Sequence, residues 1–386
     1  MTGPSGGEGK SLVTPPASRP MRFALALHHA SWAKERGSGD SDPVTRTVES
    51  ARVAGEAGID AIWASEDPEG WDSFAILSAV AAVTDRAALG PGVVNPWHRH
   101  PNQIASSVAT LDRLSGGRAF LGLGRGQVEW YRRALGIPAR RPLAALEETI
   151  GLLRQWWAPP HVAGRRDPIA GGNEVFPVRG WERSVSPAQS PPGPPIYLSA
   201  VGPRALALAG RLADGILIND FASETFIREA IATVWAAARD AGRDPDRLAV
   251  IVRANVRVTN DPEPVLERRK AGLAQIATLP GMDALVRTPG FDTDEIVGRV
   301  RQAMRTDETL ATGGGFPAMR RAGDLAAARA AIPTALMAEL CPVGPLPLVR
   351  DRLARLAAMG VTEVTVAPPR PGESAEDYAA RLAALR

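Results

Sequence analysis

The chain has 386 residues, of which 45% are hydrophobic and 23% charged, proportions typical of a globular protein. Its 45 basic and 42 acidic residues leave a formal net charge of +3, and the arginines are spread along the chain, which argues against a nucleic-acid-binding surface. A single cysteine, Cys341, excludes an internal disulfide, and no spacing of cysteine and histidine indicates a metal site.

Residues 1–20 are rich in glycine, serine and proline and lack the apolar core of a signal peptide. We expect them to form a disordered lead. No later run reaches the roughly 18 apolar residues that a membrane-spanning helix needs. These features predict a cytoplasmic protein that contacts neither membrane nor nucleic acid.

From residue 21 onward, short apolar segments alternate with amphipathic ones. Strands are expected at 22–27, 59–65, 86–94, 118–124, 195–200, 214–219, 248–258 and 363–367. Helices are expected at 44–57, 72–84, 101–114, 142–157, 203–212, 222–241 and 345–359, and at the C-terminus. This alternation predicts a parallel sheet covered by helices. Eight strands favour a closed (β/α)8 barrel over an open, doubly wound α/β sheet.

Two stretches interrupt the alternation. Residues 158–194 hold many prolines and glycines, and residues from about 262 to 340 are mostly helical in pattern, with glycine-rich breaks. Long excursions from a compact barrel are usually functional loops or insertions. We therefore expect one barrel domain, residues 21–386, with two insertions that shape the substrate pocket.

Ionisable side chains follow the first two predicted strands, and ligands of such barrels bind at the C-terminal strand ends. Glu66 and Asp67 follow the second strand and either cap a helix or divide two tasks, one fixing a cofactor and the other handling a proton. His28 and His29 follow the first strand and could act as acid or base, since imidazole titrates near neutrality. Only one of this pair can face the barrel mouth, because adjacent strand residues point in opposite directions.

Two glycine-containing turns suit an anion. Gly202, Pro203 and Arg204 open a helix after the fifth strand, where free N–H groups and the helix dipole favour negative charge. Arg125 and Gly126 follow the fourth strand, where glycine allows close approach of the backbone and the arginine adds charge. Each turn alone also fits a purely structural role. Together they predict an anionic or phosphate-bearing cofactor.

The third strand ends in the unusual run LGPGVVNPWHRHP, residues 89–101. Glycine inside a strand marks a bulge or the close approach of a ligand or another backbone. Pro96 keeps the residue before it, Asn95, extended. The run therefore fits either a plain turn or a place for a planar ligand. His98 and His100 are expected as capping or surface residues. The tryptophans are expected mostly in the core, although Trp63, Trp97 and Trp130 lie near strand ends and could line a pocket.

Three motifs in this order resemble the bacterial luciferase-like superfamily: LGPGVVNPWHRHP at 89–101, ATLDRLSGGRAFLGLGRG at 109–126 and PIYLSAVGPRALALAGRLADG at 195–215. Within it, they are most similar to the F420-dependent branch typified by methylenetetrahydromethanopterin reductase. The resemblance implies a (β/α)8 barrel, a homodimer, a small-molecule substrate and coenzyme F420, a deazaflavin that passes a hydride at its C5. FMN-dependent monooxygenases share much of the pattern, so reduced FMN with oxygen is the alternative.

The resemblance also implies roles for individual residues. A non-prolyl cis peptide bond between Gly92 and Val93 would lie against the deazaflavin ring, Asn95 would contact the ring, and Glu66 stands where a ring-binding acid is usual. The remaining positions correspond to the cofactor tail or its surroundings, namely Arg125, Gly126, Gln127, Gly202, Pro203 and Arg204.

Two positions depart from the family pattern. Many relatives have Asp-His where this chain has Glu66 and Asp67, and several have an acid where it has Gln127. A sugar-phosphate dehydrogenase that relies on both groups would be poorly served. Asp67, His28 or His29, or the substrate itself, could then supply the proton. A protein that binds its ligand without turnover is the third possibility.

Overall fold

The computed structural model describes residues 20–27, 42–158 and 174–386. The expected lead, apart from Pro20, lies outside the described residues, and so do His28 and His29. No helix within the described ranges combines the length and the apolar character needed to cross a membrane.

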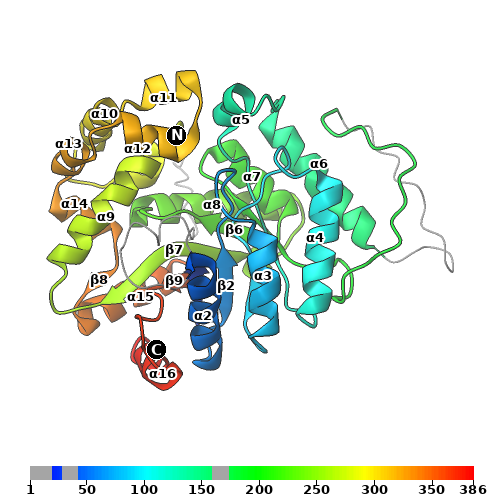
Figure 1. Ribbon diagram of the computed structural model, residues 1–386, viewed down its shortest axis with the longest axis horizontal. Coiled ribbons are helices and arrows are strands. Elements are labelled where there is room, and N and C mark those ends of the chain that lie inside the picture. Colours follow the sequence, from blue (N-terminus) through cyan, green and yellow to red (C-terminus); the bar gives the residue numbers. More distant parts are fainter. Residues whose placement is uncertain (1–19, 28–41, 159–173) are drawn as a thin grey trace, which may run out of the picture.

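Among the described residues, eight parallel strands form a barrel (Figure 1). In chain order they are β1 (Arg22–Leu27), β2 (Ala61–Ala64), β3 (Ala88–Pro91), β4 (Leu121–Leu123), β5 (Ile196–Ser199), β6 (Gly215–Ile218), β7 (Ala249–Val258) and β9 (Glu363–Val366). The order around the sheet is β3-β2-β1-β9-β7-β6-β5-β4. The bridges Leu89–Ala119 and Val94–Leu123 join β3 to β4, so the ring closes and the predicted (β/α)8 fold is confirmed.

Helices cover the outside of the barrel (Figure 1). They are α2 (Pro43–Glu56), α3 (Ser73–Ala82), α4 (Pro101–Leu114), α6 (Pro142–Trp157), α7 (Pro203–Leu212), α8 (Glu224–Asp240), α15 (Leu346–Ala358) and α16 (Ala375–Ala383). Asp42 caps α2 and, as predicted, His100 caps α4, each by accepting hydrogen bonds from the first backbone N–H groups. A further helix, α5 (Val128–Ala134), lies between the predicted strand at 118–124 and the predicted helix at 142–157, where no element is predicted.

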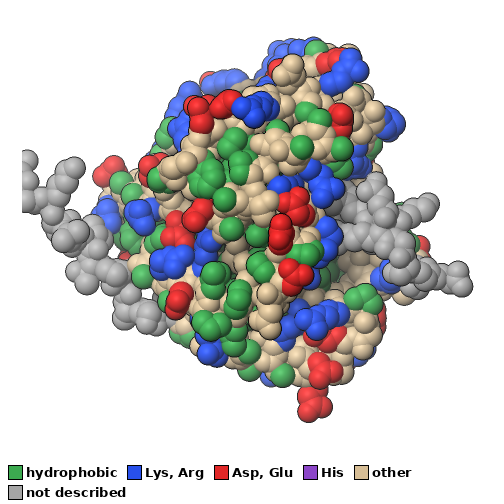
Figure 2. All heavy atoms as spheres, turned by 90° about the vertical axis from the view of Figure 1, so that its left-hand side faces the viewer, with side chains coloured by type: hydrophobic (Ala, Val, Ile, Leu, Met, Phe, Trp, Pro, Cys, Tyr) green, Lys and Arg blue, Asp and Glu red, His purple; other side chains and the backbone are tan. Residues whose placement is uncertain are grey.

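Between β7 and β9 the chain forms a group of helices that lies on the left of Figure 1. They are α9 (Glu263–Ile276), α10 (Thr293–Ala303), α11 (Thr306–Thr312), α12 (Gly315–Ala322), α13 (Leu325–Ala330) and α14 (Thr334–Leu340). The short strand β8 (Val343–Gly344) then pairs with the far end of β7. Figure 2 views this side of the molecule, where basic, acidic and apolar side chains are interspersed.

Glycines let β3 and β4 approach closely where the barrel closes. A Cβ on Gly90 would overlap the backbone oxygen of Phe120, and one on Gly122 would overlap that of Pro91. The ring of Phe120 packs on Trp63 inside the barrel with 4.2 Å between ring centroids. These strand glycines are therefore required by the close approach of another backbone, which is one of the roles that the sequence indicates for glycine inside a strand.

Candidate functional site

A cavity of about 1020 Å³ opens at the C-terminal ends of the strands. Loops after β2, β3, β4, β5 and β6 line it together with β7 and α9. Its lining includes every described residue that is predicted to bind the cofactor or to transfer a proton: Glu66, Asp67, Gly92, Val93, Asn95, Arg125, Gly126, Gln127, Gly202, Pro203 and Arg204. The cavity is large enough to hold a cofactor and a substrate together.

The loop after β3 enters this cavity through Gly92 and Val93. The peptide bond between them is cis, as the resemblance predicts. Gly92 has no space for a side chain, because an added Cβ would lie 2.7 Å from the indole of Trp63. Val93 packs over β4, where a Cβ on Gly124 would lie 2.8 Å from its Cγ2. Neighbouring side chains thus fix the backbone of the pocket wall at this point.

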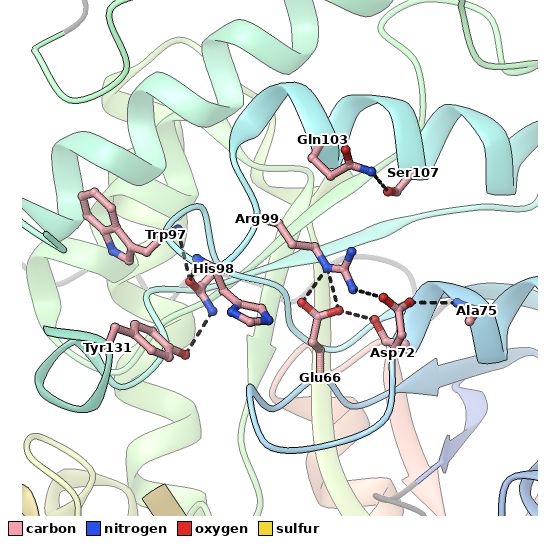
Figure 3. Close-up of polar contacts among 11 residues, drawn as sticks. Glu66, Asp72, Ala75, Trp97, His98, Arg99, Gln103, Ser107 and Tyr131 are labelled. Atoms are coloured by element: carbon pink, nitrogen blue, oxygen red, sulfur yellow. Dashed lines mark hydrogen bonds and ion pairs between the residues drawn. The ribbon is translucent and has the colours of Figure 1, made fainter. Parts of the chain in front are cut away.

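Asn95 is buried and held by hydrogen bonds (Figure 3). Its side-chain oxygen accepts from the N–H groups of Trp97 at 3.1 Å and His98 at 2.8 Å, and its amide nitrogen donates to the Tyr131 hydroxyl at 3.0 Å. Gly126 lies beside this hydroxyl, since a Cβ there would overlap it. The residue expected to contact the ring is therefore fixed by a phenol on α5.

Tyr131 belongs to the site, although the sequence analysis does not identify it. Burial raises the pKa of its hydroxyl, and the nearby carboxylates of Asp67, Glu69 and Glu66 raise it further. The phenol therefore stays protonated at neutral pH. The sequence carries little signal for Tyr131, because it is a single tyrosine in a stretch where no helix is predicted.

Glu66 forms a fixed ion pair in the wall of the pocket (Figure 3). Its carboxylate accepts from Arg99 Nε at 2.8 and 3.0 Å and from the Ser73 hydroxyl at 2.5 Å, and its side chain is only 4% exposed. Arg99 also reaches Asp72 at 2.6 Å. Any ligand that meets Glu66 must therefore share the carboxylate with Arg99, a residue that the sequence analysis does not assign to the site.

The start of α7 has the features of an anion site. Gly202 is its N-cap, no side chain caps it, and a Cβ on Gly202 would meet no atom within 4 Å. Arg204 is exposed beside it. Arg125 approaches from the end of β4 and donates to the carbonyl of Pro280 at 2.8 Å. Free backbone N–H groups and these cations fit a phosphate or carboxylate.

Arginines on β7 and α9 line the opposite part of the cavity, namely Arg253, Arg257, Arg268 and Arg269. Asp220, which follows β6, lies 3.8 Å from Arg253 and 3.6 Å from Arg269. The sequence analysis does not identify this group. The available signal is the spacing of Arg253, Asn255 and Arg257 at every second residue of a predicted strand, and all three line the cavity although β7 is irregular at Asn255.

Of the three tryptophans suggested for the pocket, only Trp130 lines it. The prediction is wrong for Trp63, which lies inside the barrel and donates to the buried carboxylate of Glu363 at 2.7 Å. It is also wrong for Trp97, whose ring packs on Phe176. Trp71 and Trp181, expected in the core, are 48% and 52% exposed.

The family model of luciferase-like monooxygenases matches residues 21–363. A 5,10-methylenetetrahydromethanopterin reductase of Methanolobus tindarius is 34% identical over 221 residues, 57% of this chain and 64% of that relative. An F420-dependent glucose-6-phosphate dehydrogenase of Mycolicibacterium gilvum is 30% identical, over 58% of this chain and 68% of that relative.

The fold matches the solved structure of the coenzyme F420-dependent tetrahydromethanopterin reductase from Methanopyrus kandleri with a TM-score of 0.68. That match has 23% identity and covers 94% of this chain and 97% of the other. At the level of the fold, the similarity therefore covers nearly the whole chain. The predicted family is thereby confirmed, and the chain belongs to the luciferase-like monooxygenase family.

Proposed function

We propose that this chain is a coenzyme F420-dependent oxidoreductase that passes a hydride between the deazaflavin C5 and a small organic substrate, and that it works as a homodimer. The observation that carries the proposal is the gathering, in one cavity, of every described residue that the resemblance assigns to F420. The names of the relatives support it, since one is an F420-dependent dehydrogenase.

The residues present fit such a cofactor. The start of α7 offers open space and an uncapped helix N-terminus, and the side chain of Arg204 has no hydrogen bond or ion pair to any described residue. Gly202, Pro203, Arg204, Arg125, Gly126 and Gln127 would hold the anionic tail. Gly92, Val93 and Asn95 would hold the ring, with Glu66 beside them. When bound, coenzyme F420 supplies the hydride donor or acceptor.

Asp67 is the described residue to which we assign proton transfer. It lines the cavity beside Glu66, whose own carboxylate is held by Arg99. A carboxylate in this place can take or give a proton as hydride moves. His28 remains the second predicted candidate, and it lies outside the described residues.

Cofactor choice is tested by titrating the purified protein with F420 and, separately, with FMN while following fluorescence. We expect saturable F420 binding that Arg204→Gln weakens at least fivefold. Arg211→Gln is the control, because Arg211 is exposed on α7 and does not line the cavity. Tight FMN binding without F420 binding would overturn the proposal in favour of a flavin monooxygenase.

The proton role is tested with Asp67→Asn, using a substrate identified from a panel of alcohols, aldehydes and imines. General acid–base catalysis contributes roughly 100- to 10,000-fold, so we expect a rate loss in that range with F420 affinity retained. His28→Asn is made in parallel. If Asp67→Asn keeps the wild-type rate and pH profile while His28→Asn loses both, the role belongs to His28. If no substrate of the panel is turned over although F420 binds, a binding protein without catalysis becomes the better description.

A further inference from the structure

The part of the cavity opposite Gly92 and Val93 carries a surplus of positive charge. We call it the basic wall and define it as Arg253 and Arg257 on β7 with Arg268 and Arg269 on α9. The strand order places three strands between β3 and β7 in either direction around the barrel. The basic wall therefore faces the predicted ring contacts across the mouth of the barrel.

Two elements bring these side chains together. β7 is irregular between Val252 and Val256, where its pairing with β9 shifts and Asn255 has φ +50°, and Arg253 and Arg257 both line the cavity on either side of Asn255. Arg268 and Arg269 lie on α9 with Gln275, seven residues beyond Arg268, on the helix face that also lines the cavity. The cluster thus comes from one strand and one helix that meet at the cavity.

Two of the four arginines are already engaged. Arg253 donates to the Gly92 carbonyl at 3.2 Å, and Arg269 donates to the Ala254 carbonyl at 3.2 Å and lies 5.0 Å from the centre of the Phe221 ring. Both approach Asp220. These contacts fix the two guanidinium groups. Among the described residues, Asp220 is the one carboxylate that pairs with the basic wall.

The side chains of the other two arginines, Arg257 and Arg268, have no hydrogen bond or ion pair to any described residue. Burial lowers the pKa of Arg257, and neighbouring guanidinium groups lower it further, those of Arg381, Arg268, Arg269 and Arg370. A half-buried cation among like charges is unfavourable for the empty protein and favourable for an anion that enters.

We propose that the basic wall binds a carboxylate or phosphate group of the substrate, with Arg257 and Arg268 making charge-assisted hydrogen bonds to it. The inference rests on the proposed function, because it takes the Gly92 and Val93 side of the cavity as the place of the cofactor ring. The substrate then occupies the space between that ring and the basic wall. The cofactor's own anionic tail is assigned elsewhere, at Gly202 to Arg204 after β5.

The test uses inorganic phosphate as the probe and calorimetric titration as the readout, with F420-loaded and cofactor-free protein side by side. The loaded wild type is expected to bind phosphate saturably, and Arg257→Gln and Arg268→Gln are each expected to weaken binding at least tenfold. Arg268 is exposed, so its variant should fold normally. Arg257→Lys keeps the charge and should stay within a few-fold of the wild type. Arg211→Gln is the matched control and should change nothing.

The outcomes separate this inference from the proposed function. One possible result is that the protein never binds F420, while the cofactor-free protein binds phosphate and this binding requires Arg257 and Arg268. That result would contradict the proposed function and support the anion site. If F420 displaces phosphate from Arg257 and Arg268, the wall belongs to the cofactor tail and the inference is overturned. Equal phosphate affinity in the wild type, Arg257→Gln and Arg268→Gln would also overturn it, as would the absence of saturable binding to the loaded wild type.

Discussion

Arg253 on β7 reaches across the barrel and donates a hydrogen bond to the carbonyl oxygen of Gly92 at 3.2 Å. The same guanidinium lies 3.3 Å from the Ser65 hydroxyl and 3.8 Å from Asp220, and the side chain is only 14% exposed. One side chain thus ties the ends of β2, β3 and β6 to β7 beneath the cavity.

Arg253→Met should destabilise the protein and weaken cofactor binding together. The change removes the Arg253 hydrogen bond to the Gly92 carbonyl and leaves Asp220 with Arg269 as its remaining ion-pair partner, a loss on the order of 1–3 kcal/mol in the free energy of unfolding. Urea denaturation and F420 titration measure the two effects. Arg257→Met is the matched control, because it removes an arginine of the same strand whose side chain has no partner among the described residues. Equal stability of the two variants would contradict a role for the Arg253 bridge.

Alanine should destabilise the protein at one cavity glycine, Gly126, and leave its stability unchanged at another, Gly202. Gly126 has φ +59°, and a Cβ there would overlap the Tyr131 hydroxyl, so we expect Gly126→Ala to cost roughly 1–3 kcal/mol. Gly202 has φ −73° and open space around it, so Gly202→Ala should leave the unfolding midpoint unchanged. It should still weaken F420 binding, because its methyl group enters the anion site. An unaltered F420 affinity in Gly202→Ala would argue against a cofactor tail at α7.

Tyr131→Phe removes the hydroxyl that accepts the hydrogen bond from Asn95. We expect a loss of about 0.5–1.5 kcal/mol in unfolding free energy and weaker F420 binding, since the amide is then free to turn. The pH profile of turnover between pH 6 and 9 should stay that of the wild type, because burial raises the pKa of Tyr131 above its ordinary value. If the rise or fall of turnover with pH seen in the wild type disappears in Tyr131→Phe, the phenol ionises in this range.

Glu363 should make stability depend on pH. Burial raises its pKa, so the folded protein holds this proton more tightly than the unfolded chain does. The contribution of Glu363 to stability is therefore highest below the ordinary glutamate pKa of about 4.3, falls as pH rises toward the raised pKa of the folded state, and then stays level. Glu363→Gln should remove that decline and still accept from Trp63.

Urea denaturation at a series of pH values between 4.5 and 8 measures the decline. Glu49→Gln serves as the control, because Glu49 is an exposed residue of α2 whose pKa is lowered by its hydrogen bond to Arg52, and its loss should leave the decline in place. The same slope in Glu363→Gln as in the wild type would show that another group is responsible.

The barrel could be predicted because its strands are continuous apolar runs, such as 59–65 and 214–219, separated by capped helices. Boundaries were less accurate. The sequence predicts the third strand over 86–94, and its regular part is Ala88–Pro91, because the backbone leaves the strand at the cis peptide bond between Gly92 and Val93. Helix α5 was missed because it has seven residues and no side-chain cap.

The site could be predicted where it depends on strand ends, because the barrel rule alone brings those residues together. It could not be predicted where it depends on pairs formed in space. Arg99 is 33 residues from Glu66, and Arg253 is 161 residues from Gly92. Trp63 was misplaced for the same reason, since its partner Glu363 is 300 residues away. No local pattern specifies such contacts.

The two sides of the cavity, one around Gly92 and the other the basic wall, differ in how much sequence change they can accept. Gly92 lines the side that we assign to the cofactor, and neither it nor Gly90 and Gly122 in the adjoining strands admits a side chain, so that side tolerates little variation. The opposite side is supplied partly by helices inserted between β7 and β9, which can vary in length and sequence without disturbing strand pairing. Directed evolution toward new substrates should therefore accumulate its productive changes in α9 to α12, while the half of the barrel around β3 and β4 stays constant.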